Sequence, residues 1–153
     1  MRTFASLAEL AGAAWETLGP GPWHELEQSR IDAFAAATGD DQWIHVDPER
    51  AAAGPFGSTV AHGYLTLSLI PYLMRELYRV DGVQMGVNYG LNRVRFPAPL
   101  RCGERVRCSA RVASVDPTPG GVQLVMTVTL EAEGAGKPCC VADTVTRLYG
   151  PVQ

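Results

Sequence analysis

Acidic residues and two histidines surround the entrance to the most apolar run of the chain, in TGDDQWIHVDPERAAAGPFGSTVAHGYLTLSLI (residues 38–70). Asp40 and His45 lie five positions apart in a predicted loop, a span short enough to bring both side chains to one point. A carboxylate beside an imidazole can hold a single water and move protons to and from it. This spacing therefore indicates a candidate catalytic pair that acts on water.

The same stretch also has a purely structural interpretation. Gly-Asp-Asp can end a helix and leave its acids in solvent, while His45 bonds a nearby carbonyl group. Asp41 and Asp47 are further acids that compete with Asp40 for the place beside the histidine. The residue types alone leave these alternatives open.

Ala-His-Gly at 61–63 opens the apolar run and offers a second chemical feature. The first N–H groups of a helix have no partner inside it, and the helix dipole adds partial positive charge there. Because Gly63 lacks a side chain, a substrate carbonyl could approach its N–H and be stabilised as it gains negative charge. Alternatively, Gly63 only allows tight packing. His62 is expected to cap the helix or anchor the preceding loop.

Two helices are expected before the candidate pair. The first is short and N-terminal, with Ser6 as its N-cap, and LGPGP at 18–22 separates it from an extended piece near WHELEQ. The second follows the pattern SRIDAFAAATGD, where Ser29 is the predicted N-cap and Gly39 the predicted end. Asp40 therefore begins the loop after a helix.

Helical patterns continue on the other side of the pair. Pro48 suits the first turn of a helical segment in DPERAAA. GYLTLSLIPYLMRELY, from Gly63 to Tyr78, is apolar on nearly all sides of a helix, so other elements should enclose it. Pro71 removes one helical hydrogen bond and bends the axis, which predicts one bent helix or two abutting ones.

The period of the apolar residues changes from helical to two after residue 82. RVRCSARVASV (105–115), VQLVMTVTLEAE (122–133) and CCVADTVTRLY (139–149) read as half-buried strands, and a further strand is expected over about 83–96. DPTPGG and EGAGKP supply the turns of an antiparallel meander. One buried helix followed by such a sheet predicts an α+β domain in which the sheet wraps around the helix.

Length and composition limit the class of protein. The chain has 153 residues, 46% hydrophobic and 19% charged, with a net charge of −3. These values favour a single domain over 1–153 and no nucleic-acid partner. The four cysteines lack metal-ligand spacing, and no stretch reaches the roughly 20 apolar residues of a membrane span. We expect a cytoplasmic protein with reduced cysteines and no membrane association.

FAAATGDDQWIHVD followed by FGSTVAHGYLTLSL resembles the MaoC-like family of (R)-specific enoyl-CoA hydratases, including its nodulation protein N-like branch. NYGLNRVRFPAPLRCGERV is similar to the strand and turn that follow in that family. The resemblance covers nearly the whole chain, and its specific part lies between residues 34 and 106. It implies a hotdog fold, in which an antiparallel β-sheet wraps a long central helix, and commonly a homodimer.

The resemblance also implies roles for individual residues. Asp40 and His45 become the catalytic pair, and the backbone N–H of Gly63 binds the thioester oxygen. Ser68 matches a family position that supports the aspartate. These roles are the ones expected of an enzyme that adds water to an acyl thioester.

Two residues depart from the family pattern. Gln42 and Trp43 stand where the family often has Asn-Pro. Gln42 can still bond water, whereas the bulk of Trp43 can reshape the acyl tunnel. Apolar residues around the central helix and its covering strand are expected to line that tunnel, with Phe56, Tyr64, Leu65, Leu69, Val87 and Tyr89 as candidates.

These features predict a hydro-lyase that reversibly adds water, on one face, to a trans-2-enoyl thioester and gives the (R)-3-hydroxyacyl thioester. The water held by the pair attacks C3 while a proton reaches C2, and the acid and base roles remain unassigned. The expected substrate is an acyl-CoA or acyl carrier protein thioester. Coenzyme A is then part of the substrate, and the reaction requires neither a metal nor a redox cofactor.

Basic residues of the first long strands are candidates for the phosphates of coenzyme A. Arginine suits bidentate phosphate contacts, and one or two members of this group are expected to make them. The group consists of Arg93, Arg95, Arg101, Arg105, Arg107 and Arg111.

Two other functions share the predicted architecture. A hotdog thioesterase would take the same thioesters and release free CoA. A noncatalytic subunit would bind the thioester without turning it over. The spacing of Asp40 and His45 and the following Ala-His-Gly favour the hydratase.

Overall fold

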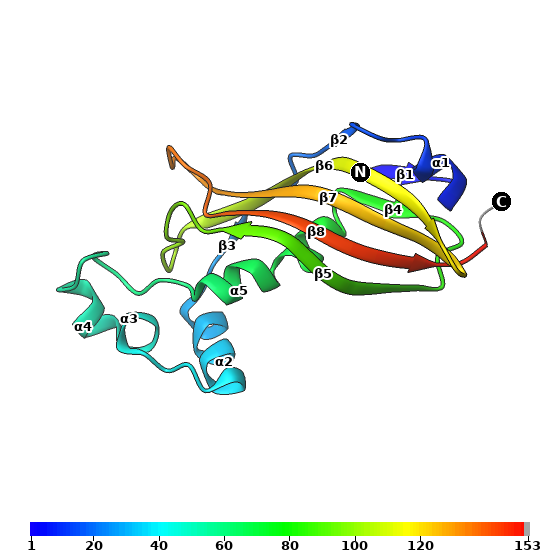
Figure 1. Ribbon diagram of the computed structural model, residues 1–153. Helices are drawn as coiled ribbons and strands as arrows, with labels where there is room; N and C mark the ends of the chain where they lie inside the picture. The colour runs from blue at the N-terminus through cyan, green and yellow to red at the C-terminus, as the bar shows by residue number, and fades with distance from the viewer. Residues whose placement is uncertain (152–153) are drawn as a thin grey trace.

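An antiparallel sheet forms the main body of the computed structural model, which describes residues 1–151 (Figure 1). The sheet follows the order β2-β6-β7-β8-β5, and β3 also pairs with β6. Its strands are β2 (Thr17–Leu18), β3 (His24–Glu25), β5 (Met85–Arg95), β6 (Arg105–Thr118), β7 (Gly121–Ala132) and β8 (Cys140–Tyr149). β6, β7 and β8 confirm the meander predicted from the period-two pattern, and β5, the strand expected before it, pairs with β8 at the edge.

One face of this sheet carries the hydrophobic core. Alternate residues of β7, among them Leu124, Met126 and Leu130, are almost completely buried, and the residues between them are half-buried on the other face. The alternation arises because the pleat of a strand sends successive side chains to opposite faces.

The turn between β6 and β7 is shorter than predicted. Asp116 and Thr118 belong to β6, and Thr118 pairs directly with Gly121. The turn itself consists of two residues, and Gly120 takes the left-handed conformation with φ 79° that such a turn requires. An irregularity between Val112 and Ser114 shifts the register of the pairing, which then continues beyond the predicted end at Val115 to Thr118.

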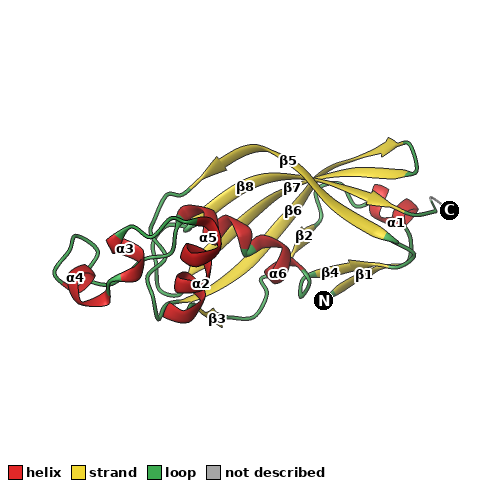
Figure 2. Ribbon diagram, turned by 90° about the horizontal axis from the view of Figure 1, so that it is seen from below, coloured by secondary structure: helices red, strands yellow, loops and turns green. Residues whose placement is uncertain are grey.

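Two abutting helices lie along the inner face of the sheet, α5 (Gly63–Ser68) and α6 (Ile70–Met74) (Figure 2). Leu69 joins them, and Pro71 stands in the first turn of α6, where its missing N–H is tolerated. Of the two predicted alternatives, one bent helix or two abutting helices, the second is therefore confirmed. Leu65 and Leu73 project into the core.

The helical segment is shorter and less enclosed than predicted. It ends at Met74, and Tyr78 instead begins β4 (Tyr78–Val80), which pairs in parallel with β1 (Arg2–Phe4). Tyr64 is 72% exposed and Tyr72 is 41% exposed, so the expectation of a fully enclosed helix is wrong for this face. Tyr72 is partly covered, because His24 of β3 lies edge-on to its ring at 5.2 Å and the guanidinium of Arg30 lies 5.2 Å from the ring centre.

The N-terminal helix has the predicted cap. In α1 (Leu7–Ala11) the hydroxyl of Ser6 accepts a hydrogen bond from the N–H of Glu9 at 3.1 Å. A short β3 follows the Pro/Gly segment at the predicted place. β1, β2 and β4 were not predicted, because strands of two or three residues are too short to show a period.

The next helix, α2 (Gln28–Thr38), begins before the predicted position. Glu27 is the N-cap, and Ser29 lies inside the first turn with its hydroxyl directed to the Glu27 carboxylate, so the prediction of Ser29 as N-cap is wrong. Gly39 ends the helix as predicted. Two small helices follow, α3 (Trp43–Val46) and α4 (Pro48–Ala52), and Pro48 opens α4 as expected.

Helix length also bears on membrane association. Among residues 1–151, no helix is long and apolar enough to cross a membrane.

Three of the four cysteines should be unreactive in the folded protein. Burial raises the pKa of Cys108 and Cys139 to about 12 and that of Cys140 to about 11. Because the thiolate is the reactive form, we expect Ellman's reagent at mildly alkaline pH to modify Cys102 alone, which is half-buried. Unfolding in denaturant should expose all four thiols. More than one rapidly reacting thiol in the native protein would contradict this burial pattern.

Candidate active site

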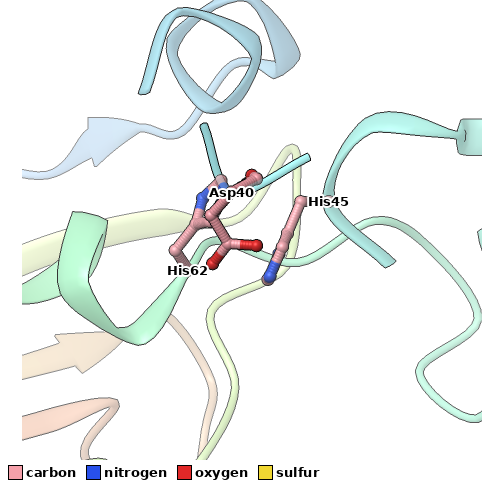
Figure 3. A group of neighbouring side chains, drawn as sticks. All are labelled: Asp40, His45 and His62. Atoms are coloured by element: carbon pink, nitrogen blue, oxygen red, sulfur yellow. The ribbon is translucent and has the colours of Figure 1, made fainter. Parts of the chain in front are cut away.

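Asp40, His45 and His62 converge at one point although they come from three segments (Figure 3). Asp40 lies in the loop after α2, His45 in α3, and His62 at the N-cap of α5. Donor or acceptor atoms of the three side chains all lie within 4.8 Å of one another. The imidazoles of His45 and His62 are buried, with 7% and 2% exposed, while Asp40 is exposed. The structure thus brings the predicted pair together and adds a second histidine.

Local chain geometry sets the positions of these residues. Gly39 ends α2 in the left-handed conformation, φ 79°, and so turns the chain out of the helix at Asp40. The side-chain amide of Gln28 donates to the carbonyl oxygen of His45 at 2.7 Å, and its own oxygen accepts from the hydroxyl of Thr59. One glutamine therefore ties α3 to α2 and to the loop before α5.

The hydrogen bond of His45 defines which of its nitrogens is free. Nδ1 lies 2.7 Å from the carbonyl oxygen of Val60. A carbonyl oxygen only accepts, so Nδ1 carries the proton, and Nε2 of the neutral ring is an acceptor. In Figure 3 the tip of this imidazole lies beside the carboxyl group of Asp40. His45 therefore offers a proton-accepting nitrogen next to the acid.

The two side chains are close enough to share one water. Within the described residues Asp40 and His45 share no direct hydrogen bond, although their polar atoms come within 4.8 Å. A water bonded to both groups at about 2.8 Å spans roughly 4.5 Å. The pair can therefore hold a single water by two hydrogen bonds.

The two histidines are poorly arranged to share a metal ion. Their rings stack with centroids 3.8 Å apart and planes inclined by 22°. Each ring also directs one nitrogen to a backbone carbonyl, Val60 for His45 and Asp40 for His62. Lone pairs of an imidazole lie in the ring plane, so stacked rings cannot both aim at an ion about 2 Å from each nitrogen. This geometry favours water and proton chemistry.

A cavity of about 350 Å³ adjoins His45. Its walls include Gly63 and Thr66 of α5, the aromatic rings of Phe56 and Phe96, and the apolar residues Ile44, Val60, Ala61, Pro97, Ala98, Pro99, Leu100 and Cys139. Gly63 is packed closely, because a Cβ at this position would lie 3.1 Å from ring carbons of Phe96. The cavity thus places His45 beside an apolar compartment at the start of α5.

Comparison with known proteins identifies the family. The family model described as "MaoC like domain" matches residues 11–135. This chain belongs to the MaoC-like dehydratase family. The 3-hydroxyacyl-thioester dehydratase Z of Mycobacterium tuberculosis is 53% identical over 148 residues, which cover 96% of this chain and 98% of the relative. Nodulation protein N of Rhizobium leguminosarum bv. viciae is 43% identical over 145 residues, which cover 92% and 89%.

A solved structure supports the same architecture. An R-hydratase from Pseudomonas aeruginosa, in its unliganded form, superimposes with a TM-score of 0.72 at 21% identity and covers 97% of this chain and 88% of its own. The predicted α+β hotdog fold is confirmed, with the central helix divided into α5 and α6. Membership in this dehydratase family also confirms the expected hydro-lyase.

The structure separates the three competing acids. Asp47 caps α4, where its carboxylate accepts from the N–H of Arg50 at 3.0 Å. Asp41 lies at a shallow depression beside Asp32, on the side of α2. Neither acid belongs to the cluster around His45, so Asp40 is the carboxylate that faces the imidazole.

Trp43 and Gln42 lie outside the cavity. The indole of Trp43 packs on Gly54, where a Cβ would come within 3.0 Å of the ring, and the guanidinium of Arg50 lies 4.4 Å from the ring centre. This contact ties α3 to α4. Gln42 is exposed at the N-cap of α3, and its carbonyl oxygen accepts from the N–H of His45 at 2.9 Å.

Ser68 and Tyr64 lie on the exposed side of α5. The hydroxyl of Ser68 donates to the carbonyl oxygen of Tyr64 within the same helix at 2.6 Å. Within the described residues, Ser68 forms no hydrogen bond with Asp40. It lines a groove of about 380 Å³ between the helices and β5, together with Leu91 and Pro71.

Tyr89 and Val87 face away from α5 and α6. Val87 pairs directly with Arg147, and the guanidinium of Arg147 lies 3.6 Å from the ring centre of Tyr89. Arg147 in turn donates to Gln123 on the outer face of the sheet. Of the predicted tunnel residues, Phe56 lines the cavity beside His45, whereas Tyr89 and Val87 do not reach it.

Sequence reasoning missed two residues that shape the site. Gln28 holds the main chain at His45, but a glutamine at the start of a helix carries no distinctive signal. Phe96 covers Gly63, and its place before Pro97 was visible only as part of a family-like segment. Both contacts join segments far apart in the chain.

The position of Trp43 predicts an effect on stability. We expect Trp43→Ala to lower the free energy of unfolding by about 2 kcal/mol, because the half-buried indole holds α3 against α4. Urea unfolding followed by circular dichroism measures this change. Trp15→Ala, at a site that is 67% exposed, is the control and should cost less than about 1 kcal/mol. Unchanged stability in Trp43→Ala would contradict the contact.

Proposed function

We propose that this chain catalyses reversible syn hydration of trans-2-enoyl thioesters to (R)-3-hydroxyacyl thioesters. The observation that carries the proposal is the proximity of Asp40 and His45, whose polar atoms lie within 4.8 Å of each other and are close enough to share one water. Gly63, which lines the same cavity as His45, supplies a backbone N–H at the start of α5.

The chemistry follows from the protonation of His45. Its Nδ1–H is engaged with Val60, so Nε2 accepts a proton from the bound water as the hydroxyl adds to C3. A proton returned from the pair forms the new bond at C2, on the same face. Negative charge that develops on the thioester oxygen is stabilised by the N–H of Gly63. In the reverse direction the same groups remove water.

The thioester class is supported by the relatives. The relative at 53% identity is named for 3-hydroxyacyl thioesters, and the name covers thioesters of coenzyme A and of acyl carrier protein alike. We infer the same class for this chain, since similarity extends over almost the full length of both proteins. Coenzyme A or the carrier is then part of the substrate.

The apolar walls of the cavity suit the acyl part of the substrate near the reacting carbons. Phe56 and Phe96 form two of these walls. Cys139 also borders the cavity, but burial raises the pKa of its thiol to about 12, which leaves it protonated and unsuited to attack a thioester.

The arginine candidates for coenzyme A divide into occupied and available groups. Arg105 and Arg107 pair with Glu133 and Glu131 across the outer face of the sheet. Arg101 donates to the carbonyl oxygen of Phe56 and pairs with a neighbouring glutamate, and Arg111 stacks on Trp15. The remaining two, Arg93 and Arg95, are exposed and close in sequence to the cavity wall at Phe96, and Arg95 donates only to the carbonyl oxygen of the adjacent Val94. We assign the phosphate contact to these two arginines.

A second copy of the chain would cover the open edge of the sheet. β5 pairs with β8 on one side only, and nearly all of its residues are exposed in the single chain. Four exposed apolar residues lie within this strand, Met85, Val87, Tyr89 and Leu91. An unpaired apolar edge strand is a template for pairing with another strand. The homodimer expected from the sequence is therefore proposed to form through β5.

The catalytic pair yields the first test of this proposal. Asp40→Asn and His45→Gln should each lower kcat at least 100-fold, since the pair moves protons in the reaction. The measurement is the loss of enoyl absorbance with crotonyl-CoA and with a longer trans-2-enoyl-CoA. Asp41→Asn changes the adjacent exposed acid and should keep activity within about threefold.

Product analysis makes this test decisive. A thiol assay run in parallel separates hydration from hydrolysis, because a thioesterase releases free CoA. Release of CoA without hydration, or full activity in Asp40→Asn, would contradict the proposal.

The proposed dimer yields a second test. Light scattering during gel filtration should give the wild type twice the mass of one chain. Val87→Lys combined with Leu91→Lys should shift the protein to the mass of one chain, because lysines on an edge strand oppose pairing. Asp116→Lys, at the far end of β6, is the control and should leave the mass unchanged. A dimer that survives both lysines on β5 would exclude this interface.

A further inference from the structure

His62 contacts both Asp40 and His45 and is almost completely buried, with 2% of its surface exposed. Its Nε2 lies 2.8 Å from the backbone carbonyl oxygen of Asp40. Its ring stacks on that of His45 at 3.8 Å and packs against Phe34 of α2 at 4.8 Å. Its own carbonyl oxygen accepts from the N–H of Thr66 and so begins α5.

The hydrogen bond to Asp40 determines the protonation of His62. The carbonyl oxygen of Asp40 only accepts, so Nε2 of His62 carries a proton. Nδ1 is buried and has no hydrogen-bond partner among the described residues. A buried polar atom without a partner costs free energy. A phenylalanine at this position could make the ring contacts without that cost.

A histidine at this position therefore supplies a hydrogen-bond donor to the carbonyl oxygen of Asp40, which a phenylalanine would not. Among residues 1–151, this is the one hydrogen bond to the main chain of Asp40. The carboxyl group of Asp40 is exposed, so its position depends on how its backbone is held. The stack on His45 also fixes the plane of the ring whose nitrogen accepts a proton.

We propose that His62 is a positioning residue that sets the distance between Asp40 and His45 at the span of one water. The proposal rests on the proposed hydratase function and adds a residue to it. The Nε2–H group of His62 holds the main chain of Asp40, and the stacked ring of His62 orients His45.

Two substitutions separate the donor from the ring. His62→Phe keeps an aromatic ring and removes the donor, whereas His62→Gln places an amide donor near the position of Nε2 and removes the ring. With crotonyl-CoA, we expect His62→Phe to lower kcat by about 10- to 100-fold with KM within twofold, because misplacement of a reacting group by about 1 Å has such an effect. His62→Gln should recover kcat to within about fivefold of the wild type.

A packing control completes the set. Phe34→Leu removes the other ring contact of His62 without touching Asp40, and it should lower Tm while leaving kcat within about threefold. Full kcat in His62→Phe would overturn the proposal, and so would equal losses in the Phe and Gln variants. If His62→Phe does not fold, His62→Gln decides: kcat within fivefold supports the donor role, and a loss beyond 30-fold overturns it.

A measurement without turnover separates this proposal from the proposed function. Long-range ¹H–¹⁵N spectra of the imidazoles should show His62 in the wild type as the Nε2–H tautomer. A different tautomer would overturn the tether even in an active enzyme. A wild type that hydrates no enoyl thioester would instead reject the hydratase function, and the spectrum would still decide whether His62 holds Asp40.

Discussion

The hydrogen bond from Nδ1 of His45 to the carbonyl oxygen of Val60 governs what this site can do. It commits the proton to one nitrogen and leaves the other as an acceptor beside Asp40. The other groups of the site are described by their positions relative to that acceptor nitrogen. Asp40 places a polar atom within 4.8 Å of the ring, and Gly63 lines the same apolar cavity as His45. If Nδ1 had no partner, the imidazole could rotate, and the distance from its acceptor nitrogen to Asp40 would not be fixed.

The fold keeps this bond in place by joining segments that are distant in the sequence. The sheet packs α5 and α6 on its inner face, which fixes the loop that carries Val60 (Figure 2). Gln28 ties α2 to the main chain at His45, and Trp43 ties α3 to α4. The polar residues at the start of α5 therefore lie at the edge of a well-packed core, where water can enter and the local geometry is still fixed. The β5 edge and Tyr64 are exposed in the single chain, and the dimer proposed above would cover the β5 edge.

Sequence reasoning reached the features that depend on local patterns. The long strands follow from alternation, the end of α2 from Gly39, and the break at Leu69 from Pro71. Asp40 and His45 were identified by residue type and spacing, and family resemblance gave them a role. Ser29 was misplaced as a cap because a helix start depends on neighbouring contacts that a pattern does not contain. Tyr89 was assigned to the tunnel because its face of the sheet depends on the irregular pairing of β5 near Asn88 and Gly90. The contact of Gln28 with His45 and the stacking of His45 on His62 escaped prediction because each joins residues 17 positions apart.

The most direct test of the central claim follows the atoms of the bound water. The reaction of a trans-2-enoyl-CoA in D₂O should give the (R)-3-hydroxyacyl-CoA with one deuterium at C2, on the same face as the new hydroxyl. NMR and chiral analysis of the released acid determine both positions. Syn addition with R configuration is the result expected when one pair of residues on one side of the substrate handles the water. Addition to opposite faces, or a racemic product, would show that the pair of Asp40 and His45 does not deliver both parts of the water.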